Sequence, residues 1–394
     1  MAAMVVSLRW VAFAGGAALT ATTFGSVVRS IVLPRGVSSL ITNAVWRLTS
    51  RPFYFAARRM SSYPAQDRLL GVLGPLTLLV LLGVWLTLLL LGFALMLWPL
   101  LGDSFDTAMR VAGSSLFTLG LAGSPRAAPT VLVFLAAATG LVVVALQIGY
   151  LPTIYGAYNR RETLVNMLES RAGEPAWGPE LLAREQLIGG LDSLGPFFTD
   201  WERWAADITE THVNYPWLVS FRSPYPLRSW VVGLLAVMDA AALFLALAPS
   251  RAPSSARHCL RTGFLGLRAL AGVLHYQANQ DPRPDDPIDL SYEEFTVAVD
   301  RLEQVGFPVE RSAEEAWRHF RGWRVNYEAA AYALADKVVA VPAPWSGVRH
   351  KLLAAGTVEV VRPPHRSPDD PEGAAVRLLR QARAQVGRQR GSRQ

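Results

Sequence analysis

The sequence predicts an all-α membrane protein with two firm transmembrane helices, a short re-entrant helix between them, a possible additional N-terminal membrane helix and a helical cytoplasmic C-terminal domain. Apolar residues make up 51% of the 394 residues and charged residues only 18%, whereas soluble domains carry about 25% charged residues. The apolar residues are concentrated before residue 152, and amphipathic helical patterns follow. A membrane half followed by a soluble half accounts for both observations.

Two long uncharged runs predict the firm spans. Leu69–Leu101 and Thr130–Leu151 contain no charged residue, and about 20 apolar residues suffice to cross a bilayer. Together they predict a transmembrane domain over residues 69–152. Within the second run, Gly140 is either a hinge at which the helix bends or a place where a neighbouring helix packs closely.

The first 68 residues predict a membrane or interfacial helix and a juxtamembrane segment. Trp10–Val28 is uncharged and is bracketed by Arg9 and Arg29. Its length and its glycines and threonines make it a marginal span, so a transmembrane helix, an interfacial helix and a cleaved signal peptide all stay open. Residues 38–68 mix arginine with aromatic residues, which is typical of the headgroup zone.

Positive charge predicts the orientation. Arg58, Arg59 and Arg68 precede the first firm span, Arg160 and Arg161 follow the second, and the connecting loop has little net charge. Since positive residues favour the cytoplasmic side, we expect both outer flanks in the cytoplasm. The protein is then a multi-pass protein of the cell (inner) membrane, with its C-terminal domain cytoplasmic.

The C-terminal part predicts a helical cytoplasmic domain over residues 153–361 and a basic flexible tail over 362–394. Trp230–Ala248 is apolar enough for a further span, but Asp239 interrupts it, and a charge at mid-depth costs on the order of 2.5–3.5 kcal/mol. We therefore expect a buried core helix in which Asp239 meets an arginine. Ser312–Ala340 predicts a long helical stretch.

The loop between the two firm spans carries the most specific pattern. Residues Ser114–Gly123 read SSLFTLGLAG and are approached by a short predicted helix from Phe105. The segment resembles the pore helix and selectivity filter of the two-transmembrane potassium-channel pore-domain family, over roughly residues 69–152. In that family four subunits line the pore with backbone carbonyls, which replace the hydration shell of the ion.

The resemblance implies a role for each matching position. It implies a tetramer that conducts a monovalent, potassium-like cation passively, with a pore helix braced by side-chain hydroxyls and a filter strip beyond it. The strip is degenerate, because leucine stands where the family has tyrosine or phenylalanine, and alanine where it has the second glycine. The implied filter residues are Thr118, Leu119, Gly120, Leu121 and Ala122, and the implied pore-helix supports are Ser114 and Ser115.

Enzyme chemistry finds little support in the sequence. There is no phosphate-binding loop, no nucleophile elbow and no zinc-protease motif, and the single cysteine, Cys259, excludes an intrachain disulfide. Glu315 and His319 have the spacing of a helix-surface pair, whereas catalytic zinc needs about three protein ligands. We expect no catalytic residue, no metal site and no cofactor.

The alternative function is a non-conducting membrane scaffold or sensor. In that hypothesis the helical cytoplasmic domain binds a partner or ligand through its tryptophans. Membrane lipids and copies of the chain itself are the expected partners, and nucleic acid is not expected because the basic tail lacks interleaved aromatic residues. The tryptophans concerned are Trp201, Trp204, Trp217, Trp317 and Trp323.

Overall fold

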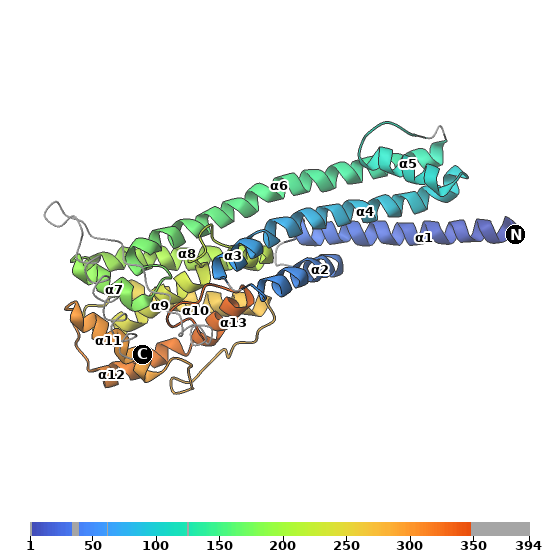
Figure 1. Cartoon of the computed structure of the whole chain (residues 1–394). Helices are drawn as coiled ribbons and strands as arrows, with labels where there is room; N and C mark the ends of the chain where they lie inside the picture. Colours follow the sequence, from blue (N-terminus) through green and yellow to red (C-terminus); the bar gives the residue numbers. More distant parts are fainter. Residues whose placement is uncertain (1, 34–38, 61, 124–125, 348–394) are drawn as a thin grey trace, which may run out of the picture. The chain divides into compact units, whose positions relative to one another are not determined.

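The structure is a computed structural model that describes residues 2–33, 39–60, 62–123 and 126–347. It is 76% helix, and its described residues contain no strand (Figure 1). The contacts divide the chain into two compact units: unit 1 comprises Met1–Arg160 and Glu210–Arg222, and unit 2 comprises Arg161–Thr209 and Ser223–Gln394. The predicted all-α fold is confirmed.

Several helices have the length and apolar composition needed to cross a membrane, which supports a multi-pass membrane protein. Within the described residues there are four such helical segments: Ser7–Val32, Tyr63–Leu101, Ala127–Ala172 and Trp230–Leu247. Unit 1 contains α1 (Ala2–Val27), α2 (Leu40–Ala57), α3 (Tyr63–Gly71), α4 (Leu73–Leu101), α5 (Phe105–Leu116) and the first part of α6 (Ala127–Ala172).

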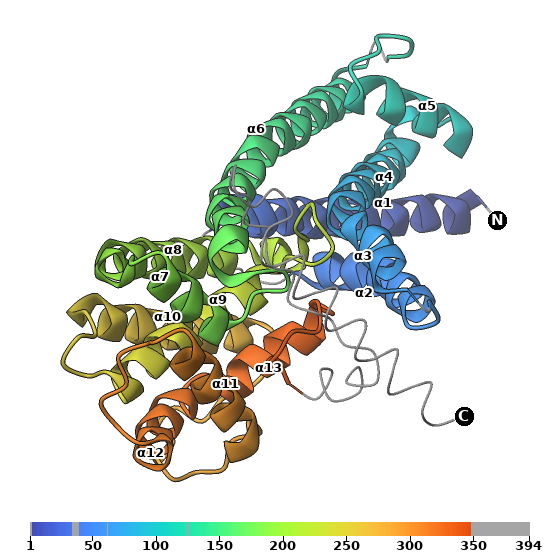
Figure 2. The same cartoon turned by 60° about the vertical axis from the view of Figure 1, so that its left-hand side comes forward.

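Helix α1 lies antiparallel along α4 (Figure 1), and Figure 2 shows the same two helices after a turn of 60°. At one end, Arg9 Nη1 donates to the Gly102 carbonyl at 3.0 Å, and toward the other end, Trp85 Nε1 donates to Ser26 Oγ at 3.0 Å. Between them the helices meet at glycines, since a β carbon added to Gly16 would lie 2.5 Å from the Gly92 carbonyl oxygen. Small residues allow this close backbone approach between membrane helices.

Helix α6 runs without a break from Ala127 to Ala172. It joins the predicted second span to the amphipathic segment that follows, and it contains Pro152. A proline removes one backbone donor, but the preceding and following turns remain helical here. The expected domain limit at residue 152 thus falls within one helix, and the contacts change unit at residues 160–161.

Unit 2 is built around α9 (Trp230–Leu247). All 18 residues of α9 are buried, and α7 (Gly178–Leu187), α10 (Ser254–Val273), α12 (Ala313–Arg324) and α13 (Glu328–Lys337) contact it. The structure confirms the expectation that this apolar segment is a buried core helix. Other helices with residues in this unit are α8 (Leu194–Asn214) and α11 (Tyr292–Gln304).

The expected helical stretch over Ser312–Ala340 consists of two helices, α12 and α13, because the chain breaks after Arg324. At the break, the Asn326 side-chain amide donates to the carbonyls of Gly322 at 3.0 Å and Trp323 at 3.2 Å. These bonds satisfy carbonyls that a continuing helix would have used. Tyr327 then leaves helical geometry with φ −131, and its buried hydroxyl reaches Asp239.

Candidate functional site

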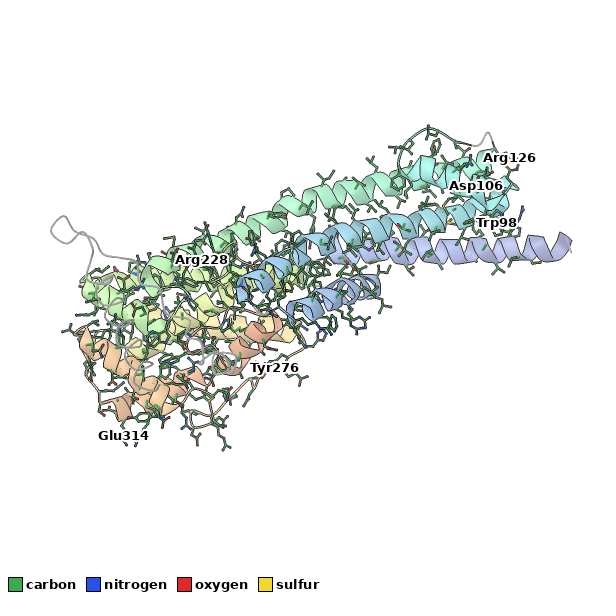
Figure 3. All side chains as sticks on the ribbon, in the orientation of Figure 1. Trp98, Asp106, Arg126, Arg228, Tyr276 and Glu314 are labelled. Atoms are coloured by element: carbon green, nitrogen blue, oxygen red, sulfur yellow. The ribbon has the colours of Figure 1, made fainter. Side chains whose placement is uncertain are left out.

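The candidate site is α5 and the loop that joins it to α6. Ser104 caps α5, since its Oγ accepts from the Thr107 N–H at 3.3 Å, as expected of a serine before a helix. The ring of Phe105 meets Trp98 of α4 edge-on at 5.6 Å between centroids, and Arg126, beyond the loop, donates to the Leu101 carbonyl at 3.0 Å. Figure 3 shows Trp98 and Arg126 at the same end of unit 1.

One face of α5 is buried against α4. The buried residues at helical spacing include Ala108, Val111, Ala112 and Leu116, and they belong to the same core cluster as Leu97 and Leu101 of α4. The opposite face carries the exposed pair Asp106–Arg110, whose charged atoms lie 2.9 Å apart. The helix is therefore held by apolar packing, and its C-terminal end delivers the loop.

Ser114 holds the loop onto the end of α5. Its Oγ accepts from the Ala122 N–H at 2.9 Å, and its carbonyl accepts from the Leu119 N–H at 2.8 Å. The Ser115 hydroxyl instead donates to the Val111 carbonyl at 2.7 Å, while its own carbonyl accepts from Thr118 N–H at 3.0 Å. Of these two serines, Ser114 holds the loop with its side chain, whereas the Ser115 side chain bonds within α5.

The loop turns through two left-handed residues. Thr118 has φ 53 and Gly120 has φ 70; this region suits glycine but is unusual for a β-branched residue such as threonine. Ala122 keeps an ordinary φ and packs against the core cluster of unit 1. Alanine at this position therefore meets no backbone conflict in this loop.

The loop presents uncharged polar groups. Residues 111–123 contain no ionisable side chain, and within the described part of the chain the main-chain carbonyls of Thr118, Leu119, Gly120 and Leu121 accept no hydrogen bond. The side chains of Leu119 and Leu121 are 58% and 82% exposed. Free carbonyls flanked by exposed apolar side chains are suited to coordinating a cation.

Gly140 of α6 supports α5 from the other side. A β carbon at this position would overlap the carbonyl oxygen of Leu116, the last residue of α5, and would lie 2.9 Å from its carbonyl carbon. The close-packing interpretation of Gly140 therefore has a specific contact. Its use as a hinge stays a prediction.

Asp239 finds the expected arginine partner. It accepts from Arg324 Nη1 at 2.5 Å and from the Tyr327 hydroxyl at 2.8 Å. Arg324 also donates to Glu328 at 2.8 Å, to the Tyr332 hydroxyl at 2.8 Å and to the Trp345 carbonyl at 2.7 Å. Burial raises the pKa of both Tyr327 and Tyr332, so both phenols keep their protons. This network is satisfied internally and holds α9, α12 and α13 together.

The remaining candidate residues lie in ordinary structural positions. Glu315 pairs with Arg311 at 3.1 Å, and the described residues contain no group of three His, Cys, Asp or Glu side chains that could hold a metal ion. Trp201 and Trp204 are buried with ring centroids 4.6 Å apart. Of the other tryptophans named above, Trp217 packs on Trp46 within unit 1 and Trp317 packs on Phe295 within unit 2.

Sequence reasoning missed two contributors to the site. Arg126 anchors the far end of the loop through the Leu101 carbonyl; its signal was a lone arginine in a short loop. The contact between Leu116 of α5 and Gly140 of α6 joins residues that no sequence motif or helical period connects. Comparisons with protein-family models, with curated proteins and with solved structures find no match.

Proposed function

We propose that this protein is an ion-channel-like membrane protein that conducts a monovalent cation passively through a pore formed by four copies of the chain. The observation that carries the proposal is the set of free carbonyls at Thr118–Leu121, presented by α5 between two membrane-length helices. Carbonyl oxygens can replace the hydration shell of a cation without a charged side chain.

The direction of α5 supports a cation over an anion. The helix begins at Phe105 and ends at Leu116, so its C-terminal end lies at the loop. The helix dipole places a partial negative charge at that end. With no ionisable group in residues 111–123, this dipole and the carbonyls set the local electrostatics.

The oligomer follows from what one chain leaves uncovered. A single loop supplies one strip of carbonyls, whereas a cation is coordinated from several sides, so strips from several copies must converge. Leu119 and Leu121, both more than half exposed in one chain, would then face neighbouring copies or lipid.

The proposed orientation places both α5 and the start of α1 outside the cell. Helices α1, α4 and α6 then form three spans, because α1 is antiparallel to α4. The arginine-rich segment between α1 and α4 and the residues after Tyr158 lie in the cytoplasm, in agreement with the distribution of positive charge.

The test is cation flux in vesicles that contain the purified full chain. The informative variant is Gly120→Ala, because residue 120 has φ 70 and a β carbon there is strained. The matched control is Gly123→Ala, since Gly123 lies in the same loop, lacks a positive φ and has open space around it. We expect at least a tenfold loss of potassium flux for the first variant and none for the second.

Two outcomes would contradict the proposal. A monomeric particle, measured by light scattering in detergent, excludes a pore built from several loops. A wild-type tetramer with no flux of potassium, sodium or rubidium favours the alternative, a non-conducting scaffold or sensor. The interior positions of Trp201 and Trp204 give that alternative no exposed tryptophan surface at these two residues.

A further inference from the structure

Residues 215–222 form a short segment at the end of a stretch, 210–222, that belongs to unit 1. The chain before and after this stretch belongs to unit 2. The chain passes from unit 2 to unit 1 at residue 210 and returns at residue 223. The segment contains a short 3-10 helix, Pro216–Ser220, and its residues Leu218, Val219 and Phe221 are buried. We call it the 215–222 segment.

Its apolar side chains contact both α4 and α6. The ring of Phe221 lies over Gly74 at the start of α4, where an added β carbon would be 2.8 Å from the ring. The same ring meets Tyr155 and Tyr158 of α6 at centroid distances of 6.0 and 5.9 Å. Tyr215 adds an edge-on contact with Tyr150 of α6 at 5.6 Å.

The two helices and the segment share one apolar cluster. Leu218 and Phe221 of the segment fill the space between one residue of α4 and three residues of α6. Its buried members are Leu78, Tyr150, Ile154, Ala157, Leu218 and Phe221. Since interiors are close-packed, the distance between α4 and α6 at this level depends on the volume that the segment supplies.

Polar contacts fix the segment at its end. The Arg222 guanidinium pairs with Asp67 of α3 and donates to the Tyr63 hydroxyl at 2.6 Å. The Arg222 carbonyl accepts from the Tyr158 hydroxyl of α6 at 3.1 Å. The side chains of Arg222 and Asp67 are only 10% and 9% exposed, so removal of one partner leaves the other charge buried and unpaired, which is costly.

The segment lies at the end of the two helices opposite to the candidate filter. The filter loop follows the Leu101 end of α4, whereas the segment packs on Gly74 and Leu78 at the other end. In a pore lined by α6, the separation of the helices at this end sets the width of the inner mouth. The chain enters unit 1 at residue 210 and re-enters unit 2 at residue 223. A movement of unit 2 that displaces either residue would therefore also displace the segment.

We propose that the 215–222 segment is a latch that fixes the spacing of α4 and α6 at their cytoplasmic ends, and that unit 2 regulates conduction by moving it. This inference rests on the proposed function for its regulatory part only. The latch itself concerns the distance between α4 and α6, and this distance is measured independently of ion flux.

The experiment measures that distance by pulsed electron spin resonance on the full chain. Spin labels replace Leu79 of α4, which is 62% exposed, and Thr153 of α6, which is also exposed, in a Cys259→Ala background. Labelled chains are diluted with unlabelled chains so that distances within one chain dominate. Phe221→Ala and Arg222→Gln are compared with Tyr225→Ala, whose side chain is 53% exposed just beyond the segment.

We expect a single narrow distance in the parent and in Tyr225→Ala. In Phe221→Ala and Arg222→Gln we expect a broadened distribution shifted by several Å, because packed helices that lose a contact between them move to another discrete arrangement. Tyr158→Phe, which removes one hydroxyl only, is the mild variant to use where Phe221→Ala fails to fold, and it should broaden the distribution less. An unchanged distribution in both Arg222→Gln and Tyr158→Phe would overturn the latch.

Flux then separates the latch from the channel. A changed distance together with a several-fold change in potassium flux supports both proposals. A changed distance in a chain that never conducts supports the latch and contradicts the channel and its regulation. An unchanged distance with normal flux contradicts the latch and leaves conduction supported.

Discussion

Gly140 of α6 contacts the backbone carbonyl of Leu116, the last residue of α5, so closely that no side chain fits between them. Leu116 is 2% exposed and is followed directly by the loop with the free carbonyls. The position of the loop is thus set by a glycine in a different helix, because α5 can approach α6 only where α6 lacks a β carbon.

Gly140→Ala should displace α5 and disturb the loop. The added methyl group overlaps backbone atoms, which cannot move aside as a flexible side chain can, and overpacking of this kind costs typically about 1–3 kcal/mol. The measurement is the thermal midpoint in detergent together with cation flux, both of which should fall. Gly149→Ala on the same helix is the matched control, since nothing lies within 4 Å of its added β carbon. Equal behaviour of the two variants would contradict the packing role of Gly140.

The contact between α1 and α4 should depend on Gly16 and not on Gly15. A side chain at residue 16 meets the Gly92 carbonyl, whereas residue 15 has open space. Thr20 and Met96 lie on this interface, with Thr20 Oγ1 and Met96 Sδ 4.0 Å apart, so cysteines at these two positions, in a Cys259→Ala background, should be joined by a short thiol-specific crosslinker. Gly16→Leu should abolish the crosslink and Gly15→Leu should preserve it; persistence in both would show that the glycine contact is dispensable.

The start of α1 should lie on the same side of the membrane as the α5 loop. Arg9 donates to the Gly102 carbonyl, so α1 must cross if α4 does. Single cysteines at Ser7 and Gly123 should therefore react with a membrane-impermeant maleimide from outside intact cells, in a Cys259→Ala background. A cysteine at Met60, between α2 and α3, should react only after the membrane is opened. Labelling of residue 7 together with residue 60 would instead place α1 outside the bilayer.

The sequence predicted what depends on local pattern. Uncharged length found α4 and the apolar part of α6, and the capping box of α11, formed by Ser291 and Glu294, is likewise a signal of neighbouring residues. The choice of a core helix over a span for α9 followed from Asp239 and the cost of a charge in lipid. Each of these rests on neighbouring residues in the chain.

What the sequence could not show are contacts between distant residues. The break between α12 and α13 is held by Arg324 and Tyr327, which both bind Asp239 of α9, 85 and 88 positions away in the sequence. The return of residues 210–222 to unit 1 depends on Arg222 meeting Asp67, and on Phe221 fitting over Gly74. No helical period contains this information, because side-chain volume and charge at both partners decide it.

Removal of Arg324 should destabilise unit 2 far more than removal of a surface arginine. Arg324 is fully buried and donates to two carboxylates, a phenol and a carbonyl, and breaking a buried ion pair costs about 3–5 kcal/mol. The buried thiol of Cys259 on α10, whose pKa is raised by burial, reports opening of this core. Its reaction with a maleimide should accelerate by roughly 10²- to 10³-fold in Arg324→Met, because each 1.4 kcal/mol changes the open population about tenfold.

Asp239→Asn should accelerate this reaction less, since Glu328 still faces the guanidinium. The control Arg318→Met removes an arginine that is 79% exposed and pairs with Glu314 on the helix surface, so its labelling rate should stay within about twofold of the parent rate. Similar rates in Arg324→Met and Arg318→Met would contradict a stabilising role for the buried network.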